Sequence, residues 1–522
     1  MILDDARGHP ATAALGIRTT LDELLRRAAA RRPDVTALID PPDRASFTTG
    51  KPRRLTYAQA DRIVSAIADR LRRMGLHTDA VVAIQIANTV ESALTILGIM
   101  RAGLIAMPLP LLWRRAEAVA ALSRVGPHAL IVSGRVGQVD HYDLAMQVAA
   151  EIFPVRYVCG YGDPVPDGVV GFDDLFTSEA RDLQPGLDAV RAGEPGAHVA
   201  AITWDVSADG LVPVARSHAE LIAGGLAVLL EGRLPPDATL LSPLPLSSFG
   251  GLAIAMIPWL LLGGTLALHQ PFDPETFRSQ LANARIDAAI VPGPLAAQFV
   301  QGGLFSAAAS DPTDRAVIGL WRAPEQLAHA PAWPRCAPRL IDVQVFGEAG
   351  LLAATRGSNG RPVAMPFGVV TAPRPTVAGA EGALAVVEIA PTPGGTLALR
   401  GPMVPRAAYP PGAEHSRLDC LKVSPDGYVD TGYACDPTRE ALVVTGPPAG
   451  IVGIGGYRFP RRTLEDLVAA VDNGTLAVLP DALAGQRLAG SASDPAAVRA
   501  ALAKVGATPL LIEAFAAHPQ AA

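Results

Sequence analysis

Lysine is nearly absent from this chain of 522 residues. It occurs only at Lys51, Lys422 and Lys504, so almost all of the 44 basic side chains are arginines. Such a preference for arginine is typical of a GC-rich bacterial genome. The formal net charge of -6 is small for this length and argues against the strongly basic surface of a nucleic-acid-binding domain. We therefore expect no nucleic-acid partner.

Cysteine is also scarce. The four cysteines, Cys159, Cys336, Cys420 and Cys435, show no C-x-x-C spacing and no histidine at the distance of a zinc ligand. We therefore expect reduced, structural thiols and no metal site.

A long unbroken apolar run is missing as well. The most apolar stretch, residues 250–268, is interrupted by Pro258 and by Gly263 and Gly264. It predicts a buried helix followed by a strand rather than a membrane span. Residues 1–5 do not begin the basic and apolar pattern of a signal peptide, so we expect a cytoplasmic protein.

What the chain does have is an alternation of helix and strand patterns. Apolar residues recur at helical spacing over 56–76 and 90–101, and short apolar runs typical of buried strands cover 81–86 and 104–109. This order predicts a parallel sheet with right-handed crossovers. The alternation returns in a second series of expected helices and strands at 219–230, 238–242, 253–262, 265–269, 277–284 and 288–291.

From residue 370 onward the pattern changes to short strands separated by turns, such as 396–400. We predict an α/β fold with a large N-terminal domain of stacked, mainly parallel sheets flanked by helices, together with a β-rich subdomain. A small, reduced α+β C-terminal domain would follow. Because two prolines between glycines at 446–450 cannot continue a helix or a strand, we place the boundary there, between residues 1–445 and a truncated domain of residues 446–522.

A series of short segments in the first part of the chain carries a family resemblance. The segments are Leu55-Thr56-Tyr57, Met74-Gly75, Val82-Ala83-Ile84, Ala102-Gly103 and Pro108-Leu109. Their order and spacing resemble the opening of the acyl-CoA synthetase-like, adenylate-forming (AMP-binding) superfamily, and the resemblance continues from residue 20 to residue 519. A working member activates a carboxylate with Mg-ATP and then transfers the acyl group to a thiol. This chain resembles a degenerate member.

The first substituted motif is the phosphate loop. The superfamily holds the ATP phosphates with a loop of the type YTSGTTGxPKGVxxSH, through backbone N–H groups, hydroxyls and one lysine. Residues 203–218 align with this loop without a gap. Val206 and Asp209 replace loop glycines, Val212 replaces the lysine, and Ser207 keeps a hydroxyl.

The charge of this segment also changes. Asp205 and Asp209 would place negative charge where a polyphosphate would sit, and like charges repel one another. Arg216 is the nearest cation in the sequence, and we expect it to be a solvated side chain near the start of a helix.

The resemblance implies further positions of the nucleotide pocket. They are Ser207, Trp321, Arg322, Ala323, Pro324, Phe346, Gly347, Glu348, Thr431 and Arg458. Trp321 and Arg322 replace glycines that lie against adenine, so we expect both to fill part of the cleft. Gly350 replaces the magnesium-associated glutamate, with Glu348 close enough to substitute after a loop shift, and Tyr433 replaces the ribose-binding aspartate. We predict no catalytic residue.

Residues 245–251 resemble the PLFHxxG segment that borders the acyl pocket. The resemblance implies that Ser248, Phe249 and Gly250 lie at the substrate, with Ser248 in place of a histidine.

The C-terminal region also departs from the family pattern. Gly453 stands where a lysine is usual, and residues 509–515 resemble the strand that leads to the adenylating lysine. Lys504 is the only lysine of this region, and we expect it at the surface.

These substitutions leave three functions open. The first is a pseudoenzyme that binds a small acyl-type ligand or a protein partner without a cofactor. The second is a working AMP-forming carboxylate ligase that uses ATP and magnesium through recruited residues, and the third is a hydrolase that uses Ser248. Because removing one preorganised group typically costs about 100- to 1000-fold in rate, several losses favour the pseudoenzyme. A homodimer is left open.

Overall fold

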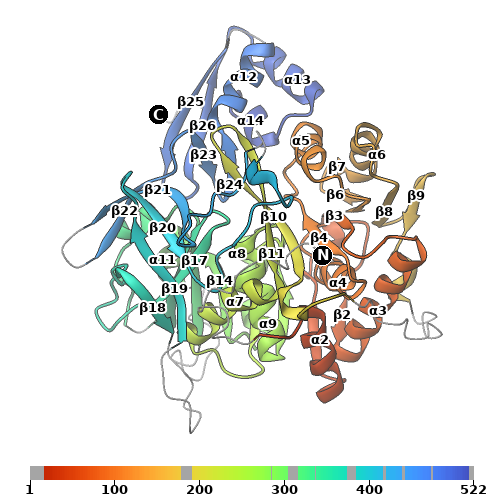
Figure 1. The fold of residues 1–522 in the computed structure, drawn as a ribbon, viewed down its shortest axis with the longest axis horizontal. Coiled ribbons are helices and arrows are strands. Elements are labelled where there is room, and N and C mark those ends of the chain that lie inside the picture. The colour runs from red at the N-terminus through yellow and green to blue at the C-terminus, as the bar shows by residue number, and fades with distance from the viewer. Residues whose placement is uncertain are drawn as a thin grey trace.

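The computed structural model describes residues 17–177, 191–283, 285–303, 315–335, 337–372, 384–415, 419–437, 441–471 and 474–516. Two large sheets are mainly parallel and two smaller sheets are antiparallel, with a short ribbon of β6 (Arg135–Val136) and β7 (Val139–Asp140). Figure 1 shows the C-terminal sheet and its helices, in blue, above the rest of the molecule. The structure confirms the predicted α/β fold.

The eight-stranded sheet has the order β17-β16-β15-β14-β12-β13-β1-β2. Its inner strands are parallel, and an antiparallel strand closes each edge. The bounds are β1 (Thr36–Ile39), β2 (Arg54–Thr56), β12 (Thr239–Ser242), β13 (Thr265–Leu268), β14 (Ala288–Pro292), β15 (Ala316–Trp321), β16 (Arg339–Phe346) and β17 (Gly350–Thr355).

The seven-stranded sheet has the order β11-β10-β4-β3-β5-β8-β9 and is parallel except for the β10–β11 pair. The bounds are β3 (Val81–Gln85), β4 (Ile105–Pro108), β5 (Ala129–Ser133), β8 (Tyr157–Tyr161), β9 (Val169–Gly171), β10 (Val199–Ser207) and β11 (Gly210–Ser217).

Helices cover both faces of each large sheet. They are α2 (Leu21–Arg31), α3 (Tyr57–Arg73), α4 (Val90–Arg101), α5 (Arg115–Val125), α6 (His141–Glu151), α7 (His218–Gly232), α8 (Phe249–Gly251), α9 (Ile257–Leu262), α10 (Pro274–Asn283) and α11 (Gly293–Gln301). Side chains of β3 alternate between two cores: Val82 and Ile84 pack in the cluster shared with α3 and α4, whereas Val81 and Ala83 pack with α5 and α6. This alternation is why both faces of the parallel strands are apolar.

The start of α3 illustrates how local sequence fixes an element. Thr56 Oγ1 accepts from Gln59 N at 3.3 Å and Thr56 N donates to Gln59 Oε1 at 2.9 Å, a reciprocal pair that satisfies two otherwise free N–H groups. After its last turn, Gly75 adopts a φ of +75°, which ends the helix.

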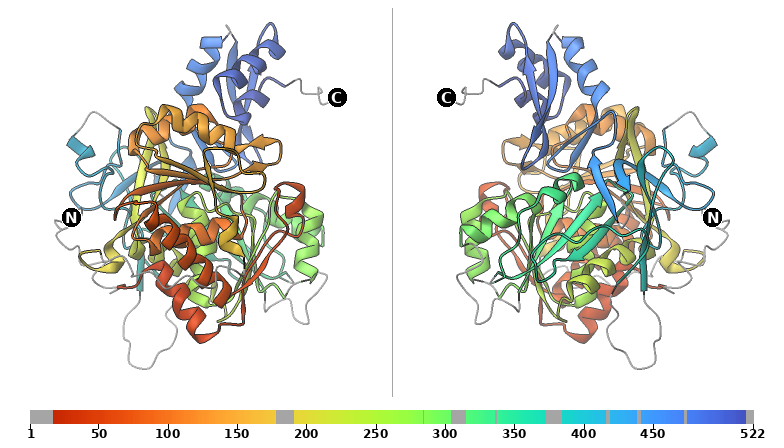
Figure 2. Two further views of the ribbon diagram at one scale, coloured as in Figure 1. Left: turned by 90° about the vertical axis from the view of Figure 1, so that its right-hand side faces the viewer. Right: turned by 90° about the vertical axis from the view of Figure 1, so that its left-hand side faces the viewer.

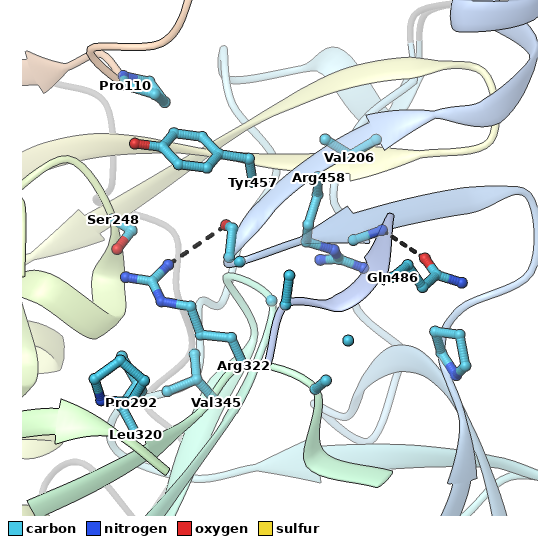
Figure 3. A pocket seen from close by; sticks show the side chains of 18 of the residues that line it. Pro110, Val206, Ser248, Pro292, Leu320, Arg322, Val345, Tyr457, Arg458 and Gln486 are labelled. Atoms are coloured by element: carbon cyan, nitrogen blue, oxygen red, sulfur yellow. Dashed lines mark hydrogen bonds between the residues drawn. The ribbon is translucent and has the colours of Figure 1, made fainter. Parts of the chain in front are cut away.

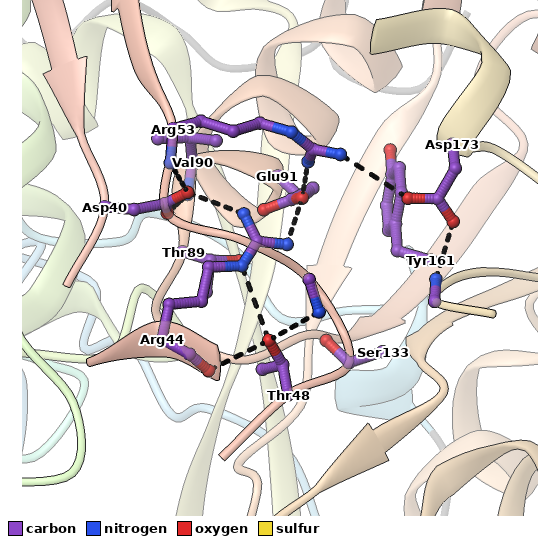
Figure 4. A network of polar contacts seen from close by, with 12 residues as sticks. Asp40, Arg44, Thr48, Arg53, Thr89, Val90, Glu91, Ser133, Tyr161 and Asp173 are labelled. Carbon is purple, nitrogen blue, oxygen red and sulfur yellow. Dashed lines mark hydrogen bonds and ion pairs between the residues drawn. The ribbon is translucent and has the colours of Figure 1, made fainter. Parts of the chain in front are cut away.

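A buried polar network joins the segment after β1 to the start of α4 (Figure 4). Asp40 Oδ1 accepts from Val90 N at 2.8 Å, and Arg44 donates to Asp40 Oδ2 and to Glu91 Oε1, both at 2.6 Å. Arg53 pairs with the same oxygen of Glu91. Each of these charges has an opposite partner, and the network ties the segment after β1 to the start of α4.

The smaller sheets follow in the second half of the chain. One contains β18 (Gly368–Ala372), β19 (Leu384–Pro391), β20 (Thr396–Arg400), β21 (Val429–Pro437) and β22 (Leu442–Gly446), and the other contains β23 (Ile451–Ile454), β24 (Tyr457–Pro460), β25 (Thr475–Asp481) and β26 (Gly485–Ser491). The second sheet packs on α12 (Arg461–Val471), α13 (Pro495–Val505) and α14 (Pro509–Glu513) around its own apolar cluster. The chain passes from one sheet to the other between Gly446 and Ile451.

Residues 509–515 correct one prediction, because they begin with helix α14 where a strand was expected. Pro509 stands in the first turn of that helix, where its missing N–H costs nothing. Lys504 is exposed on α13, as predicted.

Two further predictions concern a membrane span and the state of the cysteines. No helix within the described stretches is long and apolar enough to span a membrane. Cys159, Cys420 and Cys435 are free thiols, and Cys336 lies outside the described residues.

Candidate functional site

A pocket of about 450 Å³ lies at the carboxyl ends of four neighbouring parallel strands. Pro243 follows β12, and Pro292, Leu320 and Val345 stand at the ends of β14, β15 and β16. In open α/β sheets this edge is the usual place for a ligand, since the loops that leave it vary without disturbing the sheet.

The C-terminal sheet covers the pocket from the other side. Tyr457, Arg458 and Gln486 line it, as Figure 3 shows. Gln326 Nε2 donates to Asp481 O at 2.9 Å, which fixes the C-terminal sheet beside the end of β15.

A second set of bonds holds the C-terminal helices. Ala116 N donates to Gly506 O at 3.2 Å, and Thr508 N donates to Glu117 Oε1 at 3.0 Å. Figure 2 shows the C-terminal helices, in blue, beside the orange segment that contains α5. The C-terminal sheet and its helices are therefore held to the rest of the protein at two separate places.

The segment that aligns with a phosphate loop is a tight hairpin. β10 and β11 pair as far as Ser207 and Gly210, so only Ala208 and Asp209 remain in the turn. Ser207 Oγ accepts from Asp209 N at 3.1 Å and from Gly210 N at 3.2 Å, and it also contacts Asp419. Along a paired strand successive N–H groups point to opposite sides, so this segment lacks the concave row of amides that binds phosphate.

Asp205 lies in the pocket wall, but it is paired. Its Oδ1 contacts the guanidinium of Arg458 on β24, and its Oδ2 accepts from Glu348 N at 2.9 Å. Burial alone would lower the pKa of the Arg458 guanidinium, but the charge of Asp205 outweighs it and raises that pKa above its usual value. Asp209 is exposed in the hairpin turn and does not line the pocket, so only one of the two predicted carboxylates faces it.

Arg216 is buried, which corrects the prediction of a solvated side chain. It is 1% exposed, lies 4.0 Å from the ring of Phe249, and its Nη1 is 3.6 Å from Glu348 Oε2. The register of β11 turns this side chain inward, toward the start of α8. Its charge is therefore balanced inside the protein and is not offered to a ligand.

Glu348 forms the centre of this buried cluster. Its Oε2 accepts from Thr203 Oγ1 at 2.6 Å and from Phe249 N at 2.9 Å. Burial raises the pKa of the Glu348 carboxyl to about 7, against the opposing charge of Arg216. One oxygen of this carboxyl is thus already engaged by two protein donors.

Unlike Arg216 and Arg458, Arg322 has no ion-pair partner among the described residues. Its Nη1 donates to Gly456 O at 3.4 Å, and across the described residues no carboxylate lies within ion-pair distance of it. Burial lowers the pKa of its guanidinium, which stays protonated because arginine titrates far above neutral pH. Figure 3 shows this side chain reaching into the middle of the pocket.

The structure brings together only part of the predicted site. The predicted residues that line the pocket are Ser248, Arg322, Ala323, Gly347, Glu348 and Arg458. Those that do not line it are Ser207, Phe249, Gly250, Trp321, Pro324, Phe346 and Thr431. Ser248 also caps α8, since its Oγ accepts from Gly251 N at 3.2 Å.

Trp321 points away from the pocket, contrary to the expectation that it crowds the cleft. Its Nε1 donates to Asp342 Oδ1 at 2.8 Å, and its indole packs on Gly293. Because neighbouring residues of a strand face opposite sides, Leu320 and Arg322 face the pocket and Trp321 cannot. Phe346 is turned away in the same manner and packs edge-on against Tyr433, with ring centroids 5.7 Å apart.

Several lining residues were missed by the sequence motifs. Trp113 and Trp204, whose rings meet edge to face at 5.8 Å, line the pocket, as does Phe272. The strand-end prolines Pro243 and Pro292 were the available signal, since they mark where consecutive parallel strands stop.

The described residues do not fit Mg-ATP. None of the residues that line the pocket is a lysine, and Tyr433, in place of the ribose-binding aspartate, donates to Arg322 O at 3.4 Å. Gly350 has no side chain, and a Cβ there would lie 3.1 Å from Leu399. No group of three or more His, Cys, Asp or Glu in the described part of the chain could hold a metal ion.

The stacked sheets and the covered pocket at their carboxyl edge define an α/β ligand-binding architecture. The chain belongs to the AMP-binding enzyme family, whose model matches residues 25–347.

One curated relative is a 2-hydroxy-7-methoxy-5-methyl-1-naphthoate–CoA ligase of Streptomyces carzinostaticus, 27% identical over 92% of this chain and 84% of its own length. The amide bond synthetase McbA of Marinactinospora thermotolerans has a similar fold, with a TM-score of 0.70 at 19% identity over 95% of this chain and 94% of that chain. ATP-bound MatB of Rhodopseudomonas palustris is also similar, with a TM-score of 0.61 at 18% identity over 93% and 92%.

Proposed function

We propose that this chain is a catalytically degenerate member of its family, which binds an acyl-type ligand and does not activate it with ATP. The observation that carries the proposal is the β10–β11 hairpin. Its two-residue turn leaves no loop around a triphosphate, and Val212, at the lysine position, is a buried side chain of the ladder. Electrostatic stabilisation is usually the largest part of catalysis, so its loss removes most of the rate.

A small ligand is favoured over a protein partner by the pocket itself. Its volume of about 450 Å³ lies within the range of small-molecule sites, and its lining is mostly apolar.

We propose that residues 1–445 form the family's large domain and that residues 446–522 form a domain that covers the pocket. The sheet of β23 to β26 has its own apolar cluster, which supports this division.

The alternative is a working ATP-dependent ligase, and the names of the relatives favour it. The 27% identical relative is named as a CoA ligase. Glu348 would have to replace the missing magnesium carboxylate, but its Oε2 already accepts from Thr203 and Phe249. Recruiting it would break these bonds inside the protein, which is costly for a buried group.

Pyrophosphate exchange tests the proposal, because it reports adenylation without knowledge of the thiol acceptor. The unmodified protein should give no exchange above background with a panel of aliphatic, benzoic, naphthoic and arylacetic acids. An active ligase of the same family, assayed in parallel, is the positive control. Exchange with any acid of the panel would refute the pseudoenzyme and establish the ligase.

A further inference from the structure

Arg322 is placed to receive a ligand. It follows β15 at the pocket edge, and its side chain crosses to the turn between β23 and β24. Gly456, in that turn, has a φ of +99°, and a Cβ there would lie 2.1 Å from Arg322 Cδ. The close passage of this side chain therefore requires a glycine opposite it.

Among the described residues, no carboxylate lies within ion-pair distance of this guanidinium, although the charge of Glu348 acts on it from further away. The other two arginines of the site are neutralised, Arg216 by Glu348 and Arg458 by Asp205. Arg322 has only the carbonyl of Gly456, at the long distance of 3.4 Å, among the described residues. The side chain is half-buried, so its charge is only partly solvated, and an anion that enters the pocket would supply the missing partner.

The charges around the pocket limit which anion can enter. Asp205 and Glu348 are paired with arginines, but Glu325 lines the same cavity without an ion pair among the described residues, and a carboxylate there repels a group with several negative charges more strongly than a group with one. A planar carboxylate also matches the fork of a guanidinium and can accept two parallel hydrogen bonds from it.

The walls define the rest of the ligand. Pro292, Leu320 and Val345 lie below the Arg322 side chain in Figure 3, and Ser248 lies beside its guanidinium. Such a surface suits a compact aryl or alkyl group whose only polar end is its carboxylate.

We infer that this pocket binds an apolar monocarboxylate, anchored on the guanidinium of Arg322 in the space where a nucleotide would otherwise lie, and that it rejects phosphorylated ligands. The inference rests on the proposed function, since the pocket is taken to hold its ligand without ATP.

Calorimetry with matched ligands tests this inference on the intact chain. The probes are 2-naphthoate, indole-3-acetate and octanoate, with their neutral amides and with 2-naphthyl phosphate. At least one carboxylate should bind, at least about 10-fold more tightly than its amide and than the phosphate ester. This ratio corresponds to about 1.4 kcal/mol, a modest value for a charge-assisted hydrogen bond.

Variants locate the anchor. Arg322→Met should weaken binding of the carboxylate by at least about 10-fold and leave binding of the amide unchanged. The affinity of Arg322→Lys for the carboxylate should lie between those of the unmodified protein and Arg322→Met, because an ammonium lacks the planar fork. The matched control is Arg462→Met on α12, whose side chain is 85% exposed. If Arg322→Met does not fold, two measurements still decide whether Arg322 anchors the ligand. They are the carboxylate-to-amide affinity ratio of the unmodified protein and the carboxylate affinity of Arg322→Lys.

The outcomes separate the two proposals. Equal affinity for acid and amide, tighter binding of the phosphate ester, unchanged affinity in Arg322→Met, or no binding by any carboxylate would each overturn the Arg322 anchor. Pyrophosphate exchange with a carboxylate would instead overturn the pseudoenzyme, and the carboxylate-to-amide ratio measured without ATP would still decide whether Arg322 is the anchor.

Discussion

Arg458 on β24 forms an ion pair with Asp205 on β10, and this pair joins the covering C-terminal sheet to the hairpin that aligns with a phosphate loop. Both side chains are largely buried, at 15% and 17% exposure. The aspartate that first indicated repulsion of ATP thus acts as an internal counter-ion. One carboxylate thus lines the pocket and ties the covering sheet to the hairpin.

Asp205→Asn tests the structural part of this pair. The variant should lose about 1–3 kcal/mol of unfolding free energy, because Arg458 keeps its charge in a poorly solvated place and loses its partner. Guanidinium chloride unfolding measures the loss. Asp209→Asn in the same hairpin is the matched control and should change stability by less than about 0.5 kcal/mol, since its side chain is exposed. Equal stability of the two variants would contradict this role.

Mg-ATP should bind with a dissociation constant above about 1 mM, which corresponds to less than about 4 kcal/mol of binding free energy. The reason is the hairpin without a loop, together with the absence of lysine among the described pocket residues. Isothermal calorimetry measures this directly, and a ligand that binds only the folded state must also raise the melting temperature. Micromolar affinity would show that the nucleotide site survives in another form.

Restoring the loop sequence should not restore adenylation. The four changes are Asp205→Ser, Val206→Gly, Asp209→Gly and Val212→Lys, and pyrophosphate exchange is the assay. Even with a phosphate loop, Tyr433 offers no carboxylate for ribose, Gly350 offers none for magnesium, and Arg322 still reaches into the pocket. The variant also leaves Arg458 without its partner.

Two controls make the result of the four-site variant interpretable. Circular dichroism and unfolding show whether the variant still folds, and Asp205→Ser alone shows the cost of the lost ion pair. Exchange that appears only in the four-site variant would mean that the rest of the pocket is still competent and that the hairpin is the single defect.

The carboxyl of Glu348 should make stability depend on pH. Its pKa rises from the usual 4.5 to about 7 in the folded protein, chiefly through burial, so the folded state binds the proton more tightly than the unfolded state. This contribution is fully present below pH 4.5 and is lost as pH rises toward 7 and above. Its upper limit is about 3 kcal/mol.

Glu348→Gln removes this titration. Unfolding free energies of the two proteins at pH 5, 6, 7 and 8 should show that the unmodified protein loses stability relative to the variant as pH rises. Glu275→Gln, whose side chain is 79% exposed, is the control and should follow the unmodified protein. Parallel curves for Glu348→Gln and the unmodified protein would contradict a raised pKa at this site.

Part of the site could be found from sequence because it depends on strand ends. The motifs around Ser248, Arg322 and Glu348 come directly after parallel strands or at their ends, so they meet at one edge of the sheet. The motif alone does not place Trp321, because side chains alternate along β15 and neighbouring residues face opposite sides of the sheet.

Arg216 shows a different limit of sequence reasoning. Near a helix start, an arginine is usually solvated, and no local pattern indicates that its partner is Glu348, more than a hundred residues away. The same holds for Arg458 and Asp205, whose pairing depends on how the C-terminal sheet is docked.

The sequence by itself determined the order of helices and strands, the family and the missing lysines, because periodicity, capping and residue identity are local properties of the chain. Only the tertiary structure decided which charges are available to a ligand. Asp205, Arg216, Glu348 and Arg458 are neutralised in pairs, and Arg322 is left facing the pocket. The physical reason is that the effect of a charge depends on what lies within a few ångströms of it, and those neighbours come from strands far apart in the chain.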